Sequence, residues 1–406
     1  MISTDPKHIE ELLSRGVENV YPKRDFLAAR LASGTHLTLY TGYDPTAPSL
    51  HIGHGITMVK LRQFQDLGHK IVMLIGDFTG MIGDPTDKGT ARKTLTHDEC
   101  VANAKEYMKQ ASAILNFEGE NPVEVRYNGE WLSKLTTSDW LEISSNFTVQ
   151  QMIQRDMFQK RLEEEKPIFV HEFLYPLMQG FDSVAMNVDG EVGGNDQTFN
   201  MLTGRDMMNN EAIMSKYGAE KKTKEKFVLT TKLLADDSGK KMSKSEGNAI
   251  FLSDSPEDMF GKVMRFSDGM IVNAFELATR VPMSEIESIK AELDGGANPR
   301  DAKLRLAFEI TKTFLGESAA EQGRDHFKSV IQEKDKPEEI ADLTPSAYDI
   351  VTVLVEAGFC KSKSEARAQI DGKGVRINDV LVDGYDAMVK SGDVVQKGKR
   401  FFVKIV

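Results

Sequence analysis

The stretch LTLYTGYDPTAPSLHIGH, residues 37–54, decides the fold of this chain. Its first five residues are mostly apolar or β-branched, which predicts a short buried strand. Gly42 is expected to let the backbone leave the sheet at a point where a side chain would obstruct a ligand. After a turn-rich connection, apolar residues roughly keep helical spacing from Ile52 to Gly68, and glycine is typical of a helix cap.

His51 and His54 therefore lie near the start of a predicted helix. Unpaired amide groups and the helix dipole favour anions at such a position, and two imidazoles add donors. Gly53 would allow an adenine ring or a phosphate to approach the backbone. The pattern indicates a nucleotide site, although two histidines three residues apart also occur at ordinary helix starts.

A second motif lies far downstream, where residues 240–248 read KKMSKSEGN. This loop of small residues carries Lys241 and Lys244, two cations that could close over a polyphosphate. HIGH followed about two hundred residues later by KMSKS resembles the paired signature of class I aminoacyl-tRNA synthetases. Both motifs are intact, which favours the nucleotide interpretation.

Composition predicts a soluble globular protein of two or three domains. The chain has 406 residues, 40% of them apolar and 28% charged, and no apolar run approaches the ~20 residues of a membrane span. The first twenty residues include acidic side chains and no apolar core, so neither a signal nor a transit peptide is expected. Cys100 and Cys360 lack the spacing of a zinc site, and a reducing, cytoplasmic setting is expected.

Charge is distributed unevenly along the chain. The net charge of −11 argues against a protein that coats nucleic acid indiscriminately. Residues 346–406 nevertheless carry ten Lys/Arg and eight Asp/Glu. Long-range attraction to RNA would therefore favour the tail.

The order of elements predicts an α/β fold with a Rossmann-like parallel sheet. Residues 70–77 form a continuous apolar run that ends in turn residues, as in a strand buried on both faces. Strand, helix and strand in this order favour a right-handed parallel unit whose site lies at the carboxyl ends of the strands. We expect a catalytic domain over 1–235, an α-helical domain with the KMSKS loop over 236–335, and a small α+β RNA-binding domain over 343–406.

Two further segments are candidates for ligand contacts. Tyr175, Gln179 and Asp182 share one face of a helix expected over 169–181, and a polar stripe at this spacing favours a ligand-lining face. A strand is expected over 185–189, followed by a turn at 193–197, GGNDQ. The paired glycines there indicate close approach by a ligand or only a tight turn.

Residues 130–165 contain two helical patterns, the second opened by Thr148 and Gln151 and continuing to Leu162. This apolar insertion is either core or a docking surface for a partner subunit.

The chain resembles the bacterial tyrosyl-tRNA synthetases along essentially its whole length. The motifs that carry the resemblance are YTGYDPT at 40–46, HIGH, IGDP at 82–85, Tyr175 with Gln179 and Asp182, GGNDQ at 193–197, and KMSKS. The terminal unit is similar to the small αL RNA-binding domain that the family shares with a ribosomal protein. The resemblance implies a homodimer whose subunits jointly hold one tRNA, with the insertion at the interface.

The resemblance also implies a two-step reaction. Tyrosine and ATP form tyrosyl-adenylate and pyrophosphate, and the tyrosyl group then moves to the 3′-terminal ribose of tRNA(Tyr). Because the attacking carboxylate is already a nucleophile, positioning and charge stabilisation suffice. Magnesium is expected to accompany ATP without a dedicated carboxylate cage. The implied donors around the pyrophosphate are His51, His54, Lys241, Lys244, Lys88 and Arg92.

Substrate contacts follow from the same resemblance. Tyr40 and Asp182 are implied at the phenol oxygen, where phenylalanine would leave both unpaired. The implied neighbours of the α-ammonium group are Tyr175, Gln179, Gln197 and Asp84. The implied ATP contacts are Gly42, Asp44, Thr46, Gly53, Gly194, Asp196 and Lys244. A shorter connection from Asp182 to Gln197 than in some members weakens the assignments between 183 and 197.

Three other functions are compatible with parts of this pattern. Tryptophanyl-tRNA synthetases share the core, but Asp182 facing Tyr40 and the RNA-binding tail argue against them. A nucleotidylyltransferase also uses an HxGH pair but lacks KMSKS, and a catalytically silent RNA-binding protein would carry damaged motifs. In the tail, five basic residues near its two helices are either tRNA contacts or a solvated charged face: Lys361, Lys363, Arg367, Lys373 and Arg376.

Overall fold

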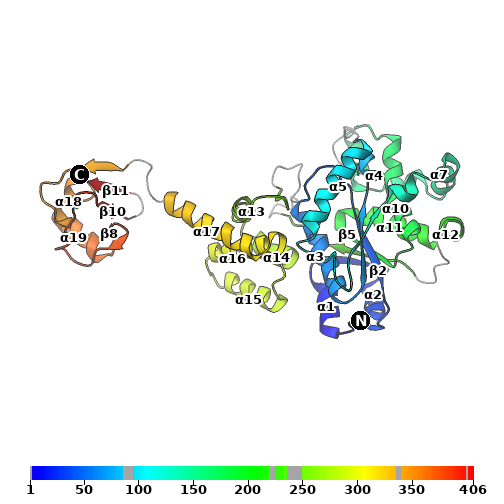
Figure 1. Cartoon of the computed structure of the whole chain (residues 1–406), viewed down its shortest axis with the longest axis horizontal. Coiled ribbons are helices and arrows are strands. Elements are labelled where there is room, and N and C mark those ends of the chain that lie inside the picture. Colours follow the sequence, from blue (N-terminus) through cyan, green and yellow to red (C-terminus); the bar gives the residue numbers. More distant parts are fainter. Residues whose placement is uncertain (1, 86–94, 219–224, 236–248, 335–339, 399–400) are drawn as a thin grey trace. The chain divides into compact units, whose positions relative to one another are not determined.

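The computed structural model describes residues 2–85, 95–218, 225–235, 249–334, 340–398 and 401–406 (Figure 1). It divides into two compact units, Met1–Arg324 and Asp325–Val406. Four predicted site residues, Lys88, Arg92, Lys241 and Lys244, lie outside the described residues, as does the whole KMSKS motif.

The first unit is built on a six-stranded sheet, which confirms the predicted Rossmann-like α/β fold. The strands are β1 (Val17–Tyr21), β2 (Thr38–Tyr43), β3 (Lys70–Ile75), β4 (Glu124–Tyr127), β5 (Gly190–Gly194) and β6 (Phe227–Thr231). Their order is β1-β6-β5-β2-β3-β4, and every neighbouring pair is parallel except β1 with β6. The order reverses beside β2, and such a switch point opens a ligand crevice at the carboxyl ends of the strands.

The predicted helix after β2 is α3 (Ile52–Asp66). It ends at Leu67, and Gly68 takes a φ of +91°, a conformation that favours glycine, so the predicted cap is confirmed. The expectation that the backbone leaves the sheet at Gly42 is wrong, because Gly42 pairs with Leu74 and β2 continues to Tyr43.

The strand predicted over 185–189 is also wrong. One short 3-10 helix, η1 (Val170–Phe173), leads into α10 (Leu174–Met186), which ends where Asn187 adopts a left-handed conformation. The expected turn at 193 and 194 is the end of β5. Glycine is needed in this strand for packing, since a Cβ on Gly190 would lie 2.1 Å from the ring of Phe227.

The insertion forms α6 (Gly129–Leu132), α7 (Thr137–Ser144), α8 (Val149–Met152) and α9 (Asp156–Glu163). Thr148 and Gln151 form the predicted capping box, but the single helix expected after them is interrupted. The backbone of Arg155 is not helical, and its guanidinium forms an ion pair with Asp84 at 3.1 Å. Ile143 and Met152 are buried in a core with α10, whereas other apolar side chains of the insertion remain exposed: Leu141, Val149 and Leu162.

The other helices of the chain cover the sheet or follow it in sequence. They are α1 (Pro6–Ser14), α2 (Arg24–Ala32), α4 (Thr79–Ile82), α5 (His97–Ala111), η2 (Asn195–Gln197), α11 (Thr198–Asn209), α12 (Glu211–Tyr217), α13 (Pro256–Val263), α14 (Met270–Ala278), α15 (Met283–Asp294), α16 (Pro299–Leu315) and α17 (Glu317–Lys334). Within the described ranges, no helix combines the length and apolarity that crossing a membrane requires.

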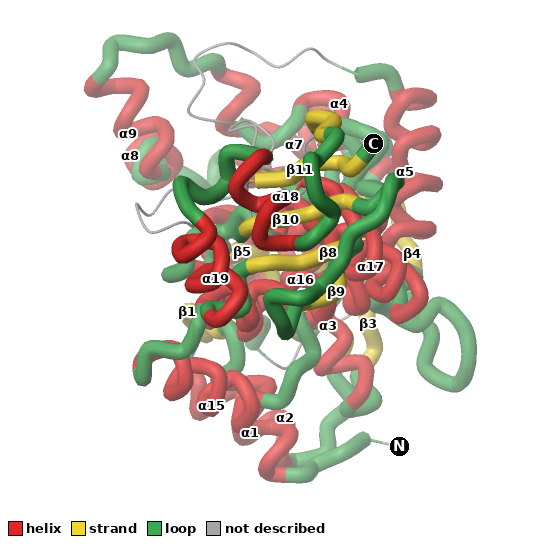
Figure 2. The backbone as a smooth tube through the Cα atoms, turned by 90° about the vertical axis from the view of Figure 1, so that its left-hand side faces the viewer, coloured by secondary structure: helices red, strands yellow, loops and turns green. Residues whose placement is uncertain are grey.

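The second unit is a small α+β fold, as predicted for the tail. Its elements are β7 (Ala341–Leu343), α18 (Ile350–Glu356), α19 (Lys363–Asp371), β8 (Val375–Ile377), β9 (Val380–Leu381), β10 (Val394–Lys397) and β11 (Phe401–Ile405). The strand order is β7-β11-β10-β8-β9, and Figure 2 shows β8, β10 and β11 side by side. Leu354, Ile370 and Val395 belong to its separate apolar core.

Candidate active site

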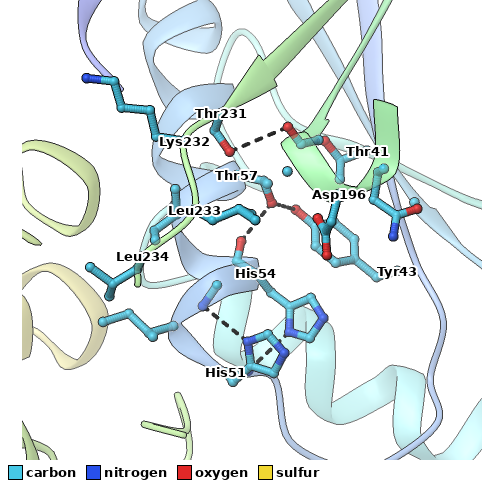
Figure 3. A pocket seen from close by; sticks show the side chains of 17 residues that line it. Thr41, Tyr43, His51, His54, Thr57, Asp196, Thr231, Lys232, Leu233 and Leu234 are labelled. Atoms are coloured by element: carbon cyan, nitrogen blue, oxygen red, sulfur yellow. Dashed lines mark hydrogen bonds between the residues drawn. The ribbon is translucent and has the colours of Figure 1, made fainter. Parts of the chain in front are cut away.

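A cavity of about 210 Å³ lies at the carboxyl ends of β2 and β5, where the fold predicts a ligand (Figure 3). Four segments line it: the end of β2, the start of α3, the turn after β5, and the residues that follow β6. Seven residues of the sequence prediction line this cavity or its rim: Gly42, His51, Gly53, His54, Gly194, Asp196 and Gln197.

The two histidines of HIGH cap the helix that they begin. Nδ1 of His51 accepts the Gly53 N–H at 3.1 Å, and Nδ1 of His54 accepts the His51 N–H at 3.1 Å. Their rings stack with centroids 3.8 Å apart. The expectation of unpaired amides is therefore corrected at these two positions, and the hydrogen of each neutral ring resides on Nε2. Burial and the neighbouring His51 lower the pKa of His54 well below its usual range, which makes it a neutral donor at pH 7.

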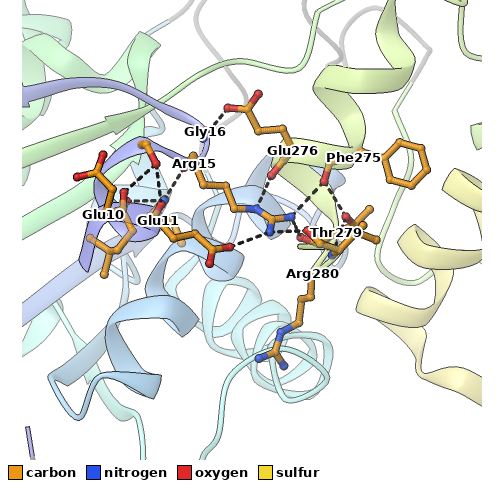
Figure 4. Close-up of polar contacts among 12 residues, drawn as sticks. Glu10, Glu11, Arg15, Gly16, Phe275, Glu276, Thr279 and Arg280 are labelled. Carbon is orange, nitrogen blue, oxygen red and sulfur yellow. Dashed lines mark hydrogen bonds and ion pairs between the residues drawn. The ribbon is translucent and has the colours of Figure 1, made fainter. Parts of the chain in front are cut away.

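Two buried basic side chains, Lys60 and Arg15, connect α3 to neighbouring helices, and Figure 4 shows the polar contacts of Arg15. Lys60 on α3 donates to the carbonyl oxygens of Leu12 and Arg15, at 2.8 and 2.6 Å. The Arg15 guanidinium in turn donates to four carbonyl oxygens at and beyond the end of α14, those of residues 275, 276, 279 and 281. These bonds fix the HIGH helix against both α1 and α14. Burial lowers the pKa of Lys60 to about 7.

Tyr40 and Asp182 are both buried and are not among the residues that line the cavity. The Tyr40 hydroxyl is 2.8 Å from Oγ of Ser183, and Asp182 accepts from Nε1 of Trp131 at 2.8 Å and from Nδ2 of Asn128 at 3.3 Å. Burial, together with the carboxylates of Glu191 and Asp182, raises the pKa of Tyr40 well above its usual range. Tyr40 therefore remains a neutral hydroxyl that can donate. Burial also raises the pKa of Asp182, and its bonds to Trp131 and Asn128 oppose that shift.

The remaining predicted tyrosine contacts are linked by hydrogen bonds. Gln197 donates to Asp84 at 3.0 Å, and the hydroxyl of Tyr175 donates to Asp44 at 2.7 Å. Nδ2 of Asn200 donates to Oε1 of both Gln179 and Gln197, at 2.9 and 3.0 Å. Three of these four residues, Asp84, Gln179 and Gln197, are thus bonded to one another directly or through Asn200, whereas Tyr175 bonds Asp44.

Two predicted ATP residues do not line the cavity. Asp44 accepts from Tyr175 and Thr79, and Thr46 is exposed on the loop after β2.

Sequence reasoning missed several residues of the same region. Six of them have buried or half-buried polar groups bonded to predicted residues: Asn128, Trp131, Arg155, Ser183, Glu191 and Asn200. The seventh, Lys226, is bonded to Ser183 and Glu191. Asn200 lies only three residues after the predicted Gln197, at the start of α11, and this spacing is the one signal that could have indicated it.

The five basic residues of the tail are all exposed, and three of them lie on α19 or β8: Lys363, Arg367 and Arg376. Arg367 also lies over the ring of Tyr385, with 5.9 Å between the guanidinium carbon and the ring centroid.

Comparison with known proteins gives this geometry a family. The family of class I tRNA synthetases (W and Y) matches residues 32–332, and the S4 domain matches residues 350–395. The tyrosine–tRNA ligase of Haemophilus ducreyi is 42% identical over 97% of this chain and 96% of its own length. The chain belongs to the tyrosine–tRNA ligases. Further relatives of that name are 42% identical in Idiomarina loihiensis and 40% in Moorella thermoacetica, each over 97% of this chain and 96% and 94% of their own lengths.

Solved structures agree with this membership. A C-terminally truncated mitochondrial tyrosyl-tRNA synthetase of Coccidioides posadasii has a TM-score of 0.63 and 27% identity, covering 79% of this chain and 91% of its own. The enzyme is therefore an aminoacyl-tRNA synthetase that uses ATP, and its C-terminal unit is of the S4 type. The tryptophanyl, nucleotidylyltransferase and catalytically silent interpretations are set aside.

Proposed function

We propose that this tyrosine–tRNA ligase binds L-tyrosine with its phenol between Tyr40 and Asp182. The observation that supports this most directly is that two polar side chains are buried together with suitable chemistry. Tyr40 is a neutral hydroxyl that can donate, and Asp182 is an acceptor that already binds the N–H groups of Asn128 and Trp131. Because phenylalanine has no hydroxyl group, it would give Tyr40 and Asp182 no hydrogen-bond partner on the ligand. ATP–pyrophosphate exchange across the twenty amino acids tests the proposal, and equal exchange with tyrosine and phenylalanine would refute it.

The α-ammonium group is proposed to lie among Asp84, Tyr175, Gln179 and Gln197. Asp84 supplies the negative charge, and the amides supply carbonyl oxygens. Gln179→Ala should raise KM for tyrosine about tenfold with a smaller change in kcat, because the lost contact is made in substrate and transition state alike. An unchanged KM would exclude Gln179 from the site.

The first chemical step is proposed to be direct attack of the tyrosine carboxylate on the α-phosphorus of ATP. The O–P bond forms as the bond to pyrophosphate breaks, so negative charge grows on the departing oxygens. His51 and His54 would donate through Nε2, joined by Lys241, Lys244, Lys88 and Arg92. The proposed ATP contacts are Gly42, Asp44, Thr46, Gly53, Gly194, Asp196 and Lys244.

Magnesium is proposed to arrive with the triphosphate and to neutralise part of its charge. It commonly needs only one or two protein carboxylates in addition to phosphate oxygens and water. Asp196, at the cavity lining, suits that requirement. Asp196→Asn should raise the magnesium concentration needed for half-maximal exchange, and an unchanged requirement would remove Asp196 from this role.

The tail is proposed to hold tRNA during the second step through Lys361, Lys363, Arg367, Lys373 and Arg376. Their exposure and the S4 match support this role. Replacing all five with glutamate should leave exchange unchanged and weaken aminoacylation, with a shallower dependence on salt. A control with Lys290→Glu and Lys312→Glu, on α15 and α16, should do neither. Unchanged aminoacylation in the fivefold variant would refute the contact.

A homodimer is proposed to form over the apolar surface of the insertion and η1. Val170 is 80% exposed, Leu141 68% and Val149 63%, and exposed large apolar side chains of this kind can mark an interface. Leu141→Glu with Val170→Glu should convert a dimer to a monomer in analytical ultracentrifugation. Val380→Glu, at a 70% exposed position of the tail unit, is the matched control and should leave the mass unchanged. A monomeric wild type would refute the proposal.

A cytoplasmic location is proposed because tRNA and ATP are the substrates of the family. Cys100 and Cys360 are both free and buried, which suits a reducing compartment. Recovery of the protein outside the cytosolic fraction of fractionated cells would contradict it.

A further inference from the structure

Lys226 and Glu191 form a buried ion pair next to Tyr40, with Nζ of Lys226 5.7 Å from the centroid of the Tyr40 ring. Lys226 precedes β6 and Glu191 lies on β5, with relative side-chain exposures of 0% and 2% and 2.5 Å between Nζ and Oε2. Apolar residues of similar volume often replace such a pair without loss of stability, so burial of two charges points to a need for specific geometry. The partners of the pair show which geometry that is.

One branch leads from Lys226 to the phenol end of the tyrosine site. The ammonium group donates its three hydrogens to Glu191, to Oγ of Ser183 at 2.7 Å and to the carbonyl oxygen of Met201 at 3.1 Å. Ser183 therefore accepts from a cation, which strengthens its own O–H as a donor. Among the described residues, its only other hydrogen-bond partner is the Tyr40 hydroxyl, at 2.8 Å. When Ser183 donates to Tyr40, the hydrogen of Tyr40 is available to the substrate oxygen.

The second branch leads from Glu191 to the ammonium end. Oε1 of Glu191 accepts from Nε2 of Gln179 at 3.1 Å, and at the far end Asp84 accepts from Nε2 of Gln197. Carboxylates only accept hydrogen bonds. Gln179 and Gln197 must therefore turn their amide nitrogens to the two carboxylates and their amide oxygens to Asn200. Asn200 accordingly donates twice, and within the described part of the chain its Oδ1 is buried without a partner. The two carboxylates thus determine the orientation of all three amides.

We propose that Lys226 and Glu191 are a positioning pair that sets the direction of hydrogen bonds at both ends of the tyrosine site. Lys226 acts through Ser183 on the Tyr40 hydroxyl, and Glu191 acts on the Gln179 amide, whose oxygen then faces the substrate ammonium group. The inference rests on the tyrosine site proposed above. Neither residue touches the substrate. Without Lys226, the Glu191 carboxylate is the strongest acceptor near Tyr40 and draws its hydrogen away from the phenol.

The two branches predict different effects on tyrosine and phenylalanine. Lys226→Met and Ser183→Ala should each lower kcat/KM for tyrosine-dependent exchange about tenfold and leave that for phenylalanine within twofold, because only tyrosine carries the phenol oxygen. The double variant should match the single ones, since both changes interrupt one path. Glu191→Gln should instead lower kcat/KM for both amino acids by a similar factor, mainly through KM, because both share the ammonium group. A merely structural pair would not divide its effects in this way.

Matched controls separate this inference from folding defects and from the site itself. Arg30→Met removes the cation of another ion pair, with Asp189 next to β5, and should change neither the tyrosine-to-phenylalanine ratio nor KM. If Lys226→Met does not fold, Ser183→Ala carries the test, with an unchanged KM for ATP as the check on its fold. A ratio within twofold of wild type in folded Ser183→Ala overturns the role of Lys226, provided that Tyr40→Phe lowers the ratio. An unchanged ratio in Tyr40→Phe as well would overturn the proposed tyrosine site.

Discussion

The two ends of the proposed active site are built in different ways. Around Tyr40 and Asp182, buried polar side chains are bonded to other protein groups before any substrate arrives. The cavity at HIGH is lined instead by glycines and by two imidazoles that cap their own helix. A rigid amino acid that differs from its nearest competitor by one hydroxyl needs directed, desolvated bonds. A charged nucleotide can be recognised by exposed backbone and by donors that act where charge develops.

The largest effect should come from the nucleotide end. His54→Ala removes a neutral Nε2 donor, so kcat for ATP–pyrophosphate exchange should fall about 10²- to 10³-fold, while KM for tyrosine changes little. Steady-state exchange with each substrate varied in turn measures both quantities. If His54→Ala instead raised only the KM for tyrosine, His54 would belong to the tyrosine end, and the two ends would not differ as proposed.

A smaller effect is expected at the phenol end. Tyr40→Phe should reduce the tyrosine-to-phenylalanine ratio of kcat/KM about tenfold to hundredfold, because it leaves the phenol oxygen with one partner fewer. Tyr43→Phe is the matched control, since its hydroxyl bonds Thr57 on the nucleotide side at 3.0 Å. That variant should keep the ratio. If both variants changed the tyrosine-to-phenylalanine ratio equally, specificity for tyrosine would not depend on Tyr40 in particular.

Gly53→Ala tests how closely the HIGH backbone and its histidines fit. An added Cβ would lie 2.9 Å from Cε1 of His51, so the imidazole must turn away from its capping position. Exchange activity should fall about tenfold through this displacement. The free energy of unfolding should change by less than about 1 kcal/mol, because alanine's helix propensity offsets the weakened cap. Full activity would show that the position of His51 is not critical.

The smallest effect concerns the support beneath the nucleotide end. The pKa of Lys60 is lowered to about 7 by burial, from 10.5 in an exposed lysine. Between these values the unfolded chain binds more protons than the folded one, so stability rises with pH in that window. Lys60→Met should remove up to about 1.4 kcal/mol per pH unit of this slope in urea denaturation. Lys70→Met, at a side chain 43% exposed, should retain the wild-type slope. If Lys60→Met left the pH dependence of the free energy of unfolding unchanged, Lys60 would not titrate in this range.

Much of the architecture was predictable because the local sequence preferences agree with the tertiary structure. The apolar run of β3, the cap at Gly68 and the capping box at Thr148 each follow from short-range physics and were confirmed. The position of β5 was not predictable in this way. Its glycines indicate a turn locally, whereas the ring of Phe227 on the neighbouring strand excludes a side chain at Gly190.

The residues of the candidate site differ in the same way in how well the sequence predicts them. Residues in recognisable motifs, such as His51, His54 and Gly194, were found from the sequence and lie at the cavity. Lys226 and Glu191 were missed because isolated charges beside strands usually face water, and only the folded chain brings these two together. The break at Arg155 was missed for a similar reason, since its partner Asp84 is remote in sequence.

The bonds from Trp131 and Asn128 to Asp182 limit how this enzyme could be redesigned for unnatural amino acids. Shortening Asp182 to make room for a bulkier para substituent would leave Nε1 of Trp131 without this acceptor and Nδ2 of Asn128 bonded only to Thr79, and each unsatisfied N–H costs about 1–3 kcal/mol. A variant library that randomises Asp182 alone would therefore yield mostly weakened enzymes. Libraries that vary Asn128, Trp131 and Asp182 together can exchange the whole polar cluster for an apolar one of equal volume.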